Sequence, residues 1–138
     1  MSRPKTAPLL LDASAILALL RREPGAQRVQ DALRQQPCSV SSVTLTELEG
    51  KLIGRGEYTA TQVRSAVEGI APLMDELAFD AECRSYATFY YARKSPYDLS
   101  LGDAACLGTA EAHCLSVLTA EQNWAKLPEL PFGVELIR

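Results

Sequence analysis

The hydrophobic residues of this chain occur in short apolar runs that alternate with amphipathic stretches, a pattern typical of strands alternating with helices. The apolar runs predict strands at residues 9–11, 38–41, 72–77, 115–119 and 133–137. Helical spacing of apolar positions predicts helices at residues 13–20, 26–34, 43–53, 59–69, 81–92 and 121–126. This order is characteristic of an α/β fold in which a mostly parallel sheet carries helices on both faces.

One more helix is predicted after Ser100, whose hydroxyl can cap it. Its buried stripe would consist of Cys106, Leu107, Ala110 and Cys114. In an open parallel sheet, ligands bind at the carboxyl ends of the strands. Residues that follow a predicted strand or begin a predicted helix are therefore the first candidates for a functional site.

Length and composition indicate a single globular domain spanning residues 1–138, with 47% hydrophobic and 22% charged residues. The formal net charge of −3 excludes a global basic field, so a polyanion would have to bind a local cationic patch. The four cysteines form no C-x-x-C pair, and His113 is the only histidine in the sequence. These counts argue against a zinc site and against a disulfide framework.

The amino-terminal region resembles a signal peptide only superficially. Arg3 and Lys5 precede an apolar stretch at residues 9–20, but Asp12 interrupts that stretch. It ends in Arg-Arg-Glu at residues 21–23 instead of small residues, and it is too short to span a bilayer. Export and membrane insertion are therefore disfavoured, and we expect a cytoplasmic protein.

Four acidic residues stand where a predicted strand ends or a predicted helix begins: Asp12, Glu47, Asp103 and Glu121. In the expected fold all four map to the carboxyl edge of the sheet, where they would gather in one pocket. Mutual repulsion makes such a cluster costly without a cation. Carboxylate oxygens are preferred ligands of Mg²⁺ and Mn²⁺, so the four acids predict a divalent-metal site.

Helix capping offers a second interpretation of each acid. Asp12 can be an N-cap, and Glu47 lies three residues after Thr44, the spacing of a capping box. Asp103 has the same spacing from its own cap residue, and Glu121 in a first helical turn would be favoured by the helix dipole. Capping accounts for these acids one at a time, but it gives no reason for all four to fall on one side of the sheet.

Metal-assisted hydrolysis at phosphorus suits such a pocket, because it needs no histidine. One ion can activate water, and a second, about 4 Å away, can stabilise the leaving oxygen. A phosphotransfer receiver domain would also gather acids at strand ends, but Asp75 and Lys126 poorly fill its acceptor and lysine positions. A haloacid-type phosphatase would need D-x-D after the first strand, where this chain has Asp-Ala-Ser at residues 12–14.

Four segments, LLLDASAILALL, SSVTLTELEGKL, LSLGDAACLGTA and VLTAEQNWAKL, resemble in order and spacing the PIN-domain ribonucleases, especially the VapC-like toxins. The resemblance covers nearly the whole chain. It implies a PIN-like three-layer α/β/α sandwich and a Mg²⁺- or Mn²⁺-dependent endoribonuclease that hydrolyses RNA through metal-activated water. It also implies a small antitoxin partner encoded alongside, and a homodimer.

The family's acidic residues correspond to Asp12, Glu47 and Asp103. Ser14 and Thr119 occupy the positions of its supporting hydroxyls. At the fourth acid the family usually has Asp in T-A-D, whereas this chain has Glu121, which moves the carboxylate by one methylene. A second frequent acid two residues later is replaced by Asn123. These departures leave open a PIN-like module that binds RNA or antitoxin with weakened catalysis.

Cationic residues that could contact RNA are Arg21, Arg22, Lys51, Arg55, Arg93 and Lys94. Aromatic residues cluster at Tyr86, Phe89, Tyr90, Tyr91 and Tyr97. Their helical spacing favours packing in the core or at an interface over base stacking. The helix at residues 86–91 is accordingly our candidate for part of a dimer contact.

Overall fold

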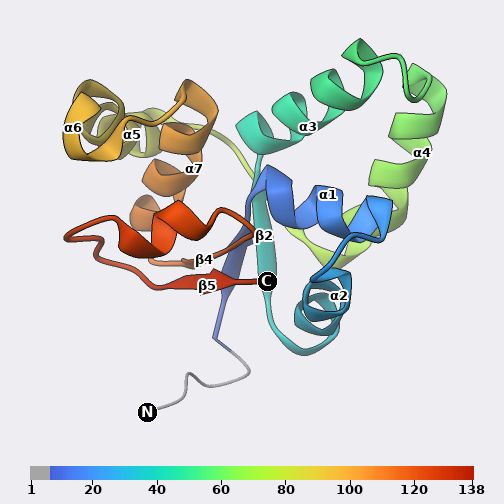
Figure 1. Cartoon of the computed structure of the whole chain (residues 1–138), viewed down its shortest axis with the longest axis horizontal. Helices are drawn as coiled ribbons and strands as arrows, with labels where there is room; N and C mark the ends of the chain where they lie inside the picture. The colour runs from blue at the N-terminus through green and yellow to red at the C-terminus, as the bar shows by residue number, and fades with distance from the viewer. Residues whose placement is uncertain (1–6) are drawn as a thin grey trace.

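The computed structural model describes residues 7–138, so Arg3 and Lys5 lie outside the described residues. Its centre is a five-stranded sheet in the order β3-β2-β1-β4-β5. Figure 1 labels three of these strands, β2, β4 and β5. The strands are β1 (Leu9–Leu11), β2 (Cys38–Ser41), β3 (Asp75–Leu77), β4 (Ser116–Thr119) and β5 (Val134–Leu136). Neighbouring strands pair in parallel throughout this sheet, which confirms the predicted parallel arrangement.

Helices cover both faces of the sheet, so the predicted three-layer α/β/α architecture is confirmed (Figure 1). One layer contains α1 (Ala13–Arg21), α2 (Ala26–Gln35), α3 (Ser42–Gly54) and α4 (Ala60–Ile70). The other contains α5 (Ala81–Ala92), the short α6 (Lys94–Tyr97) and α7 (Leu101–Ala112). No helix within residues 7–138 combines the length and the apolar character needed to cross a membrane.

The three leucines of β1 show how the sequence serves both layers. Successive side chains of a strand point to opposite faces of the sheet. Leu9 and Leu11 belong to the core cluster shared with the α1–α4 layer, and Leu10 belongs to the cluster shared with the α5–α7 layer. All three side chains are fully buried, as the uninterrupted apolar run predicted.

The predictions for the strand at residues 72–77 and for Cys114 need correction. The strand predicted at residues 72–77 is reduced to β3, because Pro72 lies in the 3₁₀ turn η1 (Ala71–Leu73). Cys114 was predicted to lie on the buried stripe of the last long helix, but it is exposed and that prediction is wrong. Helix α7 ends at Ala112, and Cys114 has a left-handed backbone with φ of 56°, as in a helix-terminating motif.

Helix α7 packs closely against α5. A Cβ added at Gly108 would lie 2.6 Å from Cα of Ala87, so a larger residue at this position would force the two helices apart. Tyr90 is buried in the same layer, whereas three other aromatic residues of α5 are exposed: Tyr86, Phe89 and Tyr91. Part of the aromatic set thus belongs to the core, and the dimer contact through α5 remains a prediction.

Candidate active site

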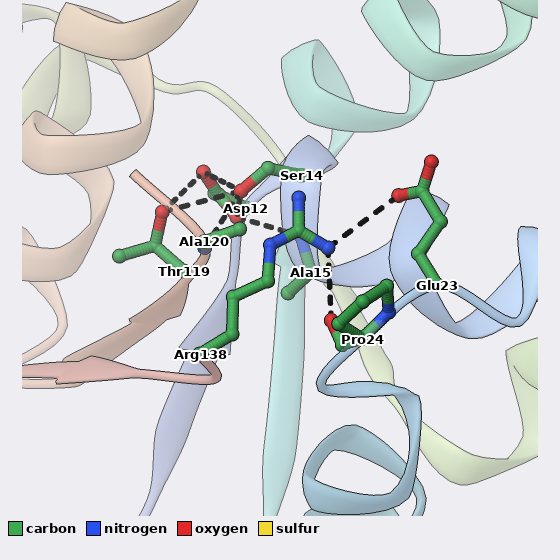
Figure 2. Close-up of polar contacts among 8 residues, drawn as sticks. All are labelled: Asp12, Ser14, Ala15, Glu23, Pro24, Thr119, Ala120 and Arg138. Atoms are coloured by element: carbon green, nitrogen blue, oxygen red, sulfur yellow. Dashed lines mark hydrogen bonds and ion pairs between the residues drawn. The ribbon is translucent and has the colours of Figure 1, made fainter. Parts of the chain in front are cut away.

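The carboxylate of Asp12 lies where the chain leaves β1 and enters α1 (Figure 2). It caps α1 by accepting a hydrogen bond from the Ala15 N–H at 3.0 Å, which confirms the capping interpretation of this residue. The hydroxyl of Ser14 donates to Oδ1 at 2.8 Å, and the hydroxyl of Thr119 donates to Oδ2 at 2.8 Å. With only 5% of the residue exposed, Asp12 is a buried carboxylate in a fixed orientation.

Both hydroxyls also bind the segment that follows β4. The Ala120 N–H donates to Ser14 Oγ at 2.9 Å, and the Glu121 N–H donates to Thr119 Oγ1 at 2.9 Å. Each hydroxyl has a single proton, which Asp12 receives, so the 3.3 Å approach of Ser14 Oγ to Thr119 Oγ1 is not a further strong hydrogen bond. The ends of β1 and β4 are therefore joined through the Asp12 carboxylate.

Arg138, which follows β5, binds the turn after α1 with its side chain (Figure 2). Its guanidinium donates to the Pro24 carbonyl at 2.8 Å and lies 3.7 Å from the Glu23 carboxylate. The adjacent Ile137 N–H donates to the Thr119 carbonyl at 2.9 Å. The chain after β5 is thus held between the turn that follows α1 and the residue that supports Asp12.

Burial dominates the acidity of Asp12. Desolvation raises its pKa from 3.8 to about 6, although hydrogen bonds from Ala15, Thr119 and Ser14 act in the opposite direction. The nearby negative charge of Glu121 raises the pKa further. The carboxylate is therefore ionised at neutral pH but destabilised, a state that a bound cation would relieve.

The other three predicted acids line the same pocket, which has a volume of about 110 Å³. Glu47 projects from α3 and Asp103 from the first turn of α7. Glu121 immediately precedes the 3₁₀ helix η2 (Gln122–Lys126). Burial raises the pKa of Asp103, and the charges of Glu47 and Glu121 add to this shift. The remaining lining residues are Ala13, Ser14, Leu17, Thr44, Lys51, Gly102, Cys106 and Trp124.

Capping accounts for fewer of these acids than the sequence suggested. The N-cap of α3 is Ser41, whose hydroxyl accepts from the Val43 N–H at 3.1 Å, so the predicted Thr44–Glu47 capping box is wrong. Glu121 precedes η2 and has no capping hydrogen bond through its side chain, so its placement in a first helical turn is also wrong. At α7 the predicted cap is present, since Ser100 Oγ accepts from the Asp103 N–H at 3.1 Å.

Gly102 is a site residue that the sequence analysis missed. A Cβ built on Gly102 would overlap the terminal oxygen of Glu47 and lie 2.9 Å from its Cδ. The Glu47 carboxylate consequently rests against the first turn of α7, beside Asp103. Glycine inside a helix is unfavourable by about 1 kcal/mol relative to alanine, and this cost was the available signal that Gly102 has a special role.

The predicted cationic and supporting residues are placed unequally. Lys51 lines the pocket, with Nζ 4.0 Å from Glu47 Oε2. Arg21 is paired with Glu57 at 2.9 Å and lines a different groove, between α1, α3 and α4. Asn123 is exposed and is not among the residues that line the acidic pocket, and the side chain of Lys94 lies outside the described residues.

The donor chemistry of the pocket suits a hard divalent cation, because four carboxylates surround it and Cys106 is the only thiol among its lining residues. Within residues 7–138, however, no three acidic, histidine or cysteine side chains lie close enough together to hold an ion as they stand. Glu121 is exposed and Glu47 is partly exposed, so these longer side chains have room to move toward Asp12 and Asp103. The residues present therefore fit a metal ion if the two glutamates move inward.

Comparisons with known proteins agree with this architecture. One similar structure is VapBC2 from Rickettsia felis bound to a promoter DNA fragment. The match covers 94% of this chain and 98% of that one, with 15% identity and a TM-score of 0.74. A toxin–antitoxin complex from Klebsiella pneumoniae gives 21% identity, a TM-score of 0.66 and coverages of 94% and 98%. VapBC-5 from Mycobacterium tuberculosis, of the VapBC family of toxin–antitoxin systems, gives 20% identity and a TM-score of 0.64, and the match covers 96% of this chain and 98% of that one.

At these identities the likeness to solved structures concerns the fold. No curated protein matches the sequence. The model of the PIN domain family, in contrast, matches residues 9–130, a range that includes all four acids of the pocket. The chain therefore belongs to the PIN domain family.

Proposed function

We propose that this protein is a Mg²⁺- or Mn²⁺-dependent endoribonuclease, the toxin of a toxin–antitoxin pair. The observation that carries the proposal is the convergence of four acids, from four separate segments, on one pocket. PIN domains of the VapC type are nucleases, which supports a hydrolase. RNA as the substrate and the divalent cation are the parts of the proposal that need direct tests.

The cation would be held by Asp12, Asp103, Glu47 and Glu121, with Asp12 as the fixed reference point. When bound, it would activate water for attack on the phosphodiester and stabilise the leaving oxygen. The hydroxyls of Ser14 and Thr119 keep Asp12 oriented by donating their protons to it. Because Asp12 is buried, its negative charge is poorly screened by water and acts strongly on a bound cation.

The side chains near the pocket give no support to a covalent nucleophile. The protons of Ser14 and Thr119 are engaged by Asp12, and neither hydroxyl has a histidine base beside it. Burial and the charges of Asp12 and Asp103 raise the pKa of the Cys106 thiol, so its reactive thiolate form is suppressed. Direct attack by water is therefore the pathway that these residues favour.

The proposed biological setting follows from the structural neighbours, which are described as VapBC toxin–antitoxin complexes. A small antitoxin that inhibits the pocket is the corresponding partner of this chain. A homodimer and a cytoplasmic location complete the proposal. A short reading frame upstream of the gene, encoding a small DNA-binding protein, would support the toxin assignment over that of a housekeeping nuclease.

The decisive experiment is cleavage of single-stranded RNA by the purified protein with Mg²⁺ or Mn²⁺, compared with Asp12→Asn and Asp103→Asn. Asp75→Asn is the matched control, because Asp75 is an exposed acid of β3 outside the pocket. We expect the wild type and Asp75→Asn to cleave, both pocket variants to lose cleavage, and EDTA to abolish it. Equal cleavage by all four proteins, or cleavage in EDTA, would contradict the proposal.

A second outcome would favour the alternative of a binding module. The wild type would then bind RNA or an antitoxin tightly and yet show no cleavage with either cation. Glu121 in the place of the family's usual aspartate is the feature that motivates this alternative.

A further inference from the structure

The acidic pocket contains one positive charge. Lys51 is the only cationic residue among the described side chains that line it. It lies one helical turn after Glu47 on α3, with Nζ 4.0 Å from Glu47 Oε2. Its side chain is 49% exposed and that of Glu47 is 28% exposed, so the ammonium group lies on the solvent side of the acids.

We propose that Lys51 is a counter-ion of the acids that gives way to the divalent cation and then contacts a phosphate of the RNA. This inference rests on the proposed function, since it assigns a partner to a residue of the same site. Lys51 thus positions the acids while no cation is bound, and it binds the substrate once the cation is in place.

The first step concerns the protein without a cation. Four carboxylates in one pocket repel each other, and a neighbouring ammonium offsets part of that repulsion. The charge of Lys51 acts on Glu47 and also on Asp103 in the first turn of α7. An exposed ion pair is weak, so a divalent cation can displace the ammonium from Glu47 at little cost.

The second step concerns RNA. A phosphodiester approaching four acids is repelled unless positive charge stands at the entrance. Two of the other predicted cationic residues have contacts elsewhere: Arg21 is paired with Glu57, and Arg93 lies 3.6 Å from the centre of the Phe89 ring. The flexible Lys51 side chain, once released from Glu47, presents its ammonium at the pocket mouth for a phosphate oxygen.

The counter-ion step can be tested without RNA. Calorimetric titration with Mn²⁺ would compare the full-length wild type, Lys51→Gln, Lys51→Arg and the control Arg55→Gln. Arg55 lies at the end of the same helix but outside the pocket, so its variant makes the same change in net charge. Loss of the competing ammonium should tighten Mn²⁺ binding about three- to tenfold in Lys51→Gln, and in neither of the other two variants.

The phosphate step is tested by steady-state cleavage of a short single-stranded RNA at saturating Mn²⁺. Lys51→Gln should raise KM about three- to tenfold with little change in kcat, because a contact made equally in the ground and transition states affects KM alone. Lys51→Arg should restore the wild-type KM, whereas a purely structural effect of the substitution would not be rescued by a second cation.

The outcomes separate this inference from the proposed function. Wild-type cleavage together with unchanged Mn²⁺ affinity in Lys51→Gln overturns the counter-ion role and leaves the nuclease assignment intact. An unchanged KM in Lys51→Gln overturns the phosphate contact in the same way. If the wild type cleaves no RNA, the phosphate contact is overturned together with the proposed function, and the Mn²⁺ titration still decides the counter-ion step.

Discussion

The pocket has two halves that differ in how they are held. The floor consists of Asp12 and Ser14, which line the pocket, together with Thr119, which binds Asp12 from behind the lining. The rim consists of Glu47, Asp103 and Glu121. The floor is joined by short hydrogen bonds between the ends of β1 and β4. The rim acids project from helix α3, helix α7 and the turn after β4, with more exposure and fewer hydrogen bonds.

This difference suggests a division of labour. A buried, fully bonded carboxylate cannot adjust to a ligand, so the floor defines where a cation would sit. Exposed side chains on helix ends lose little by moving, so the rim can close around the cation once it is present. Substitutions in the floor should therefore have large effects on activity and stability together, whereas substitutions in the rim should affect binding with little effect on stability.

Asp12→Asn should have the largest effect, with complete loss of metal-dependent cleavage and, in EDTA, an increase in stability. Because burial raises the folded-state pKa, the stability linked to Asp12 is full below pH 3.8 and is lost as the pH rises through about 6. The loss above that range is at most about 3 kcal/mol for a shift from 3.8 to about 6. Denaturation at pH 7.5 and pH 4.5 should therefore show a larger stabilisation of the variant at the higher pH.

Mn²⁺ provides the control for that prediction. It should stabilise the wild type by mass action and leave Asp12→Asn unchanged. A variant that is less stable than the wild type at pH 7.5 in EDTA would contradict the prediction, because the hydrogen bonds of Asp12 would then outweigh its desolvation.

Thr119→Val should rank second. It preserves shape while removing the donor to Asp12 and the acceptor for the Glu121 N–H. Leaving that N–H and the carboxylate without their partner should lower the free energy of unfolding by about 1–3 kcal/mol. Activity should fall about tenfold to a hundredfold, as for other residues that orient metal ligands.

Ser14→Ala is the companion variant. The stability of both variants is measured by urea denaturation, and their activity by RNA cleavage. Ser14 makes the equivalent pair of bonds to Asp12 and Ala120 but is partly exposed, so water can replace it and its loss should have the smaller effect. A larger effect at Ser14 would contradict the ranking by burial.

Gly102→Ala tests whether the rim separates function from stability. Alanine is favoured over glycine within helices by up to about 1 kcal/mol, so stability should stay equal or rise. The new methyl group would overlap the Glu47 carboxylate and turn it away from Asp103. We expect Mn²⁺ affinity to fall about threefold to tenfold, measured by calorimetry, with an unchanged or higher melting temperature.

Gly108→Ala on the same helix is the contrasting control. There the added Cβ meets backbone atoms of Ala87 on α5, which cannot rotate away as a side chain can. This variant should lose about 1–3 kcal/mol of stability through overpacking. Similar losses of stability at both glycines would mean that Glu47 is held as rigidly as the core.

The floor was easier to predict from the sequence than the rim. Asp12 follows three leucines directly, so a local pattern determines both its strand and its position as an N-cap. The layers were predictable for the same reason, because apolar runs and helical spacing are local features. The bonds of Ser14 and Thr119 to Asp12 could be expected only from the family resemblance, since β1 and β4 are neighbours in space but distant in sequence.

The rim depends on information that no local pattern contains. The segment before Glu47 offers Ser41, Ser42 and Thr44 as hydroxyl caps, and the choice of Ser41 follows from where β2 ends. Contact between Glu47 and Gly102 exists only because α3 packs near the start of α7. Cys114 likewise fitted the helical spacing, but the helix ended two residues earlier.

Glu121→Gln should have the smallest effect, and it tests most directly whether the rim is held less firmly than the floor. Glu121 is exposed, and its backbone N–H, not its carboxylate, is what Thr119 binds. Removing its charge should leave stability within about 0.5 kcal/mol of the wild type, as for other surface substitutions, and weaken Mn²⁺ about threefold. Glu121→Asp, measured by the same titration, retains the charge but retracts it by one methylene. Its Mn²⁺ affinity should therefore lie between those of the wild type and Glu121→Gln. A loss of affinity in Glu121→Gln as large as in Asp12→Asn would mean that the turn after β4 holds the cation as firmly as the buried floor.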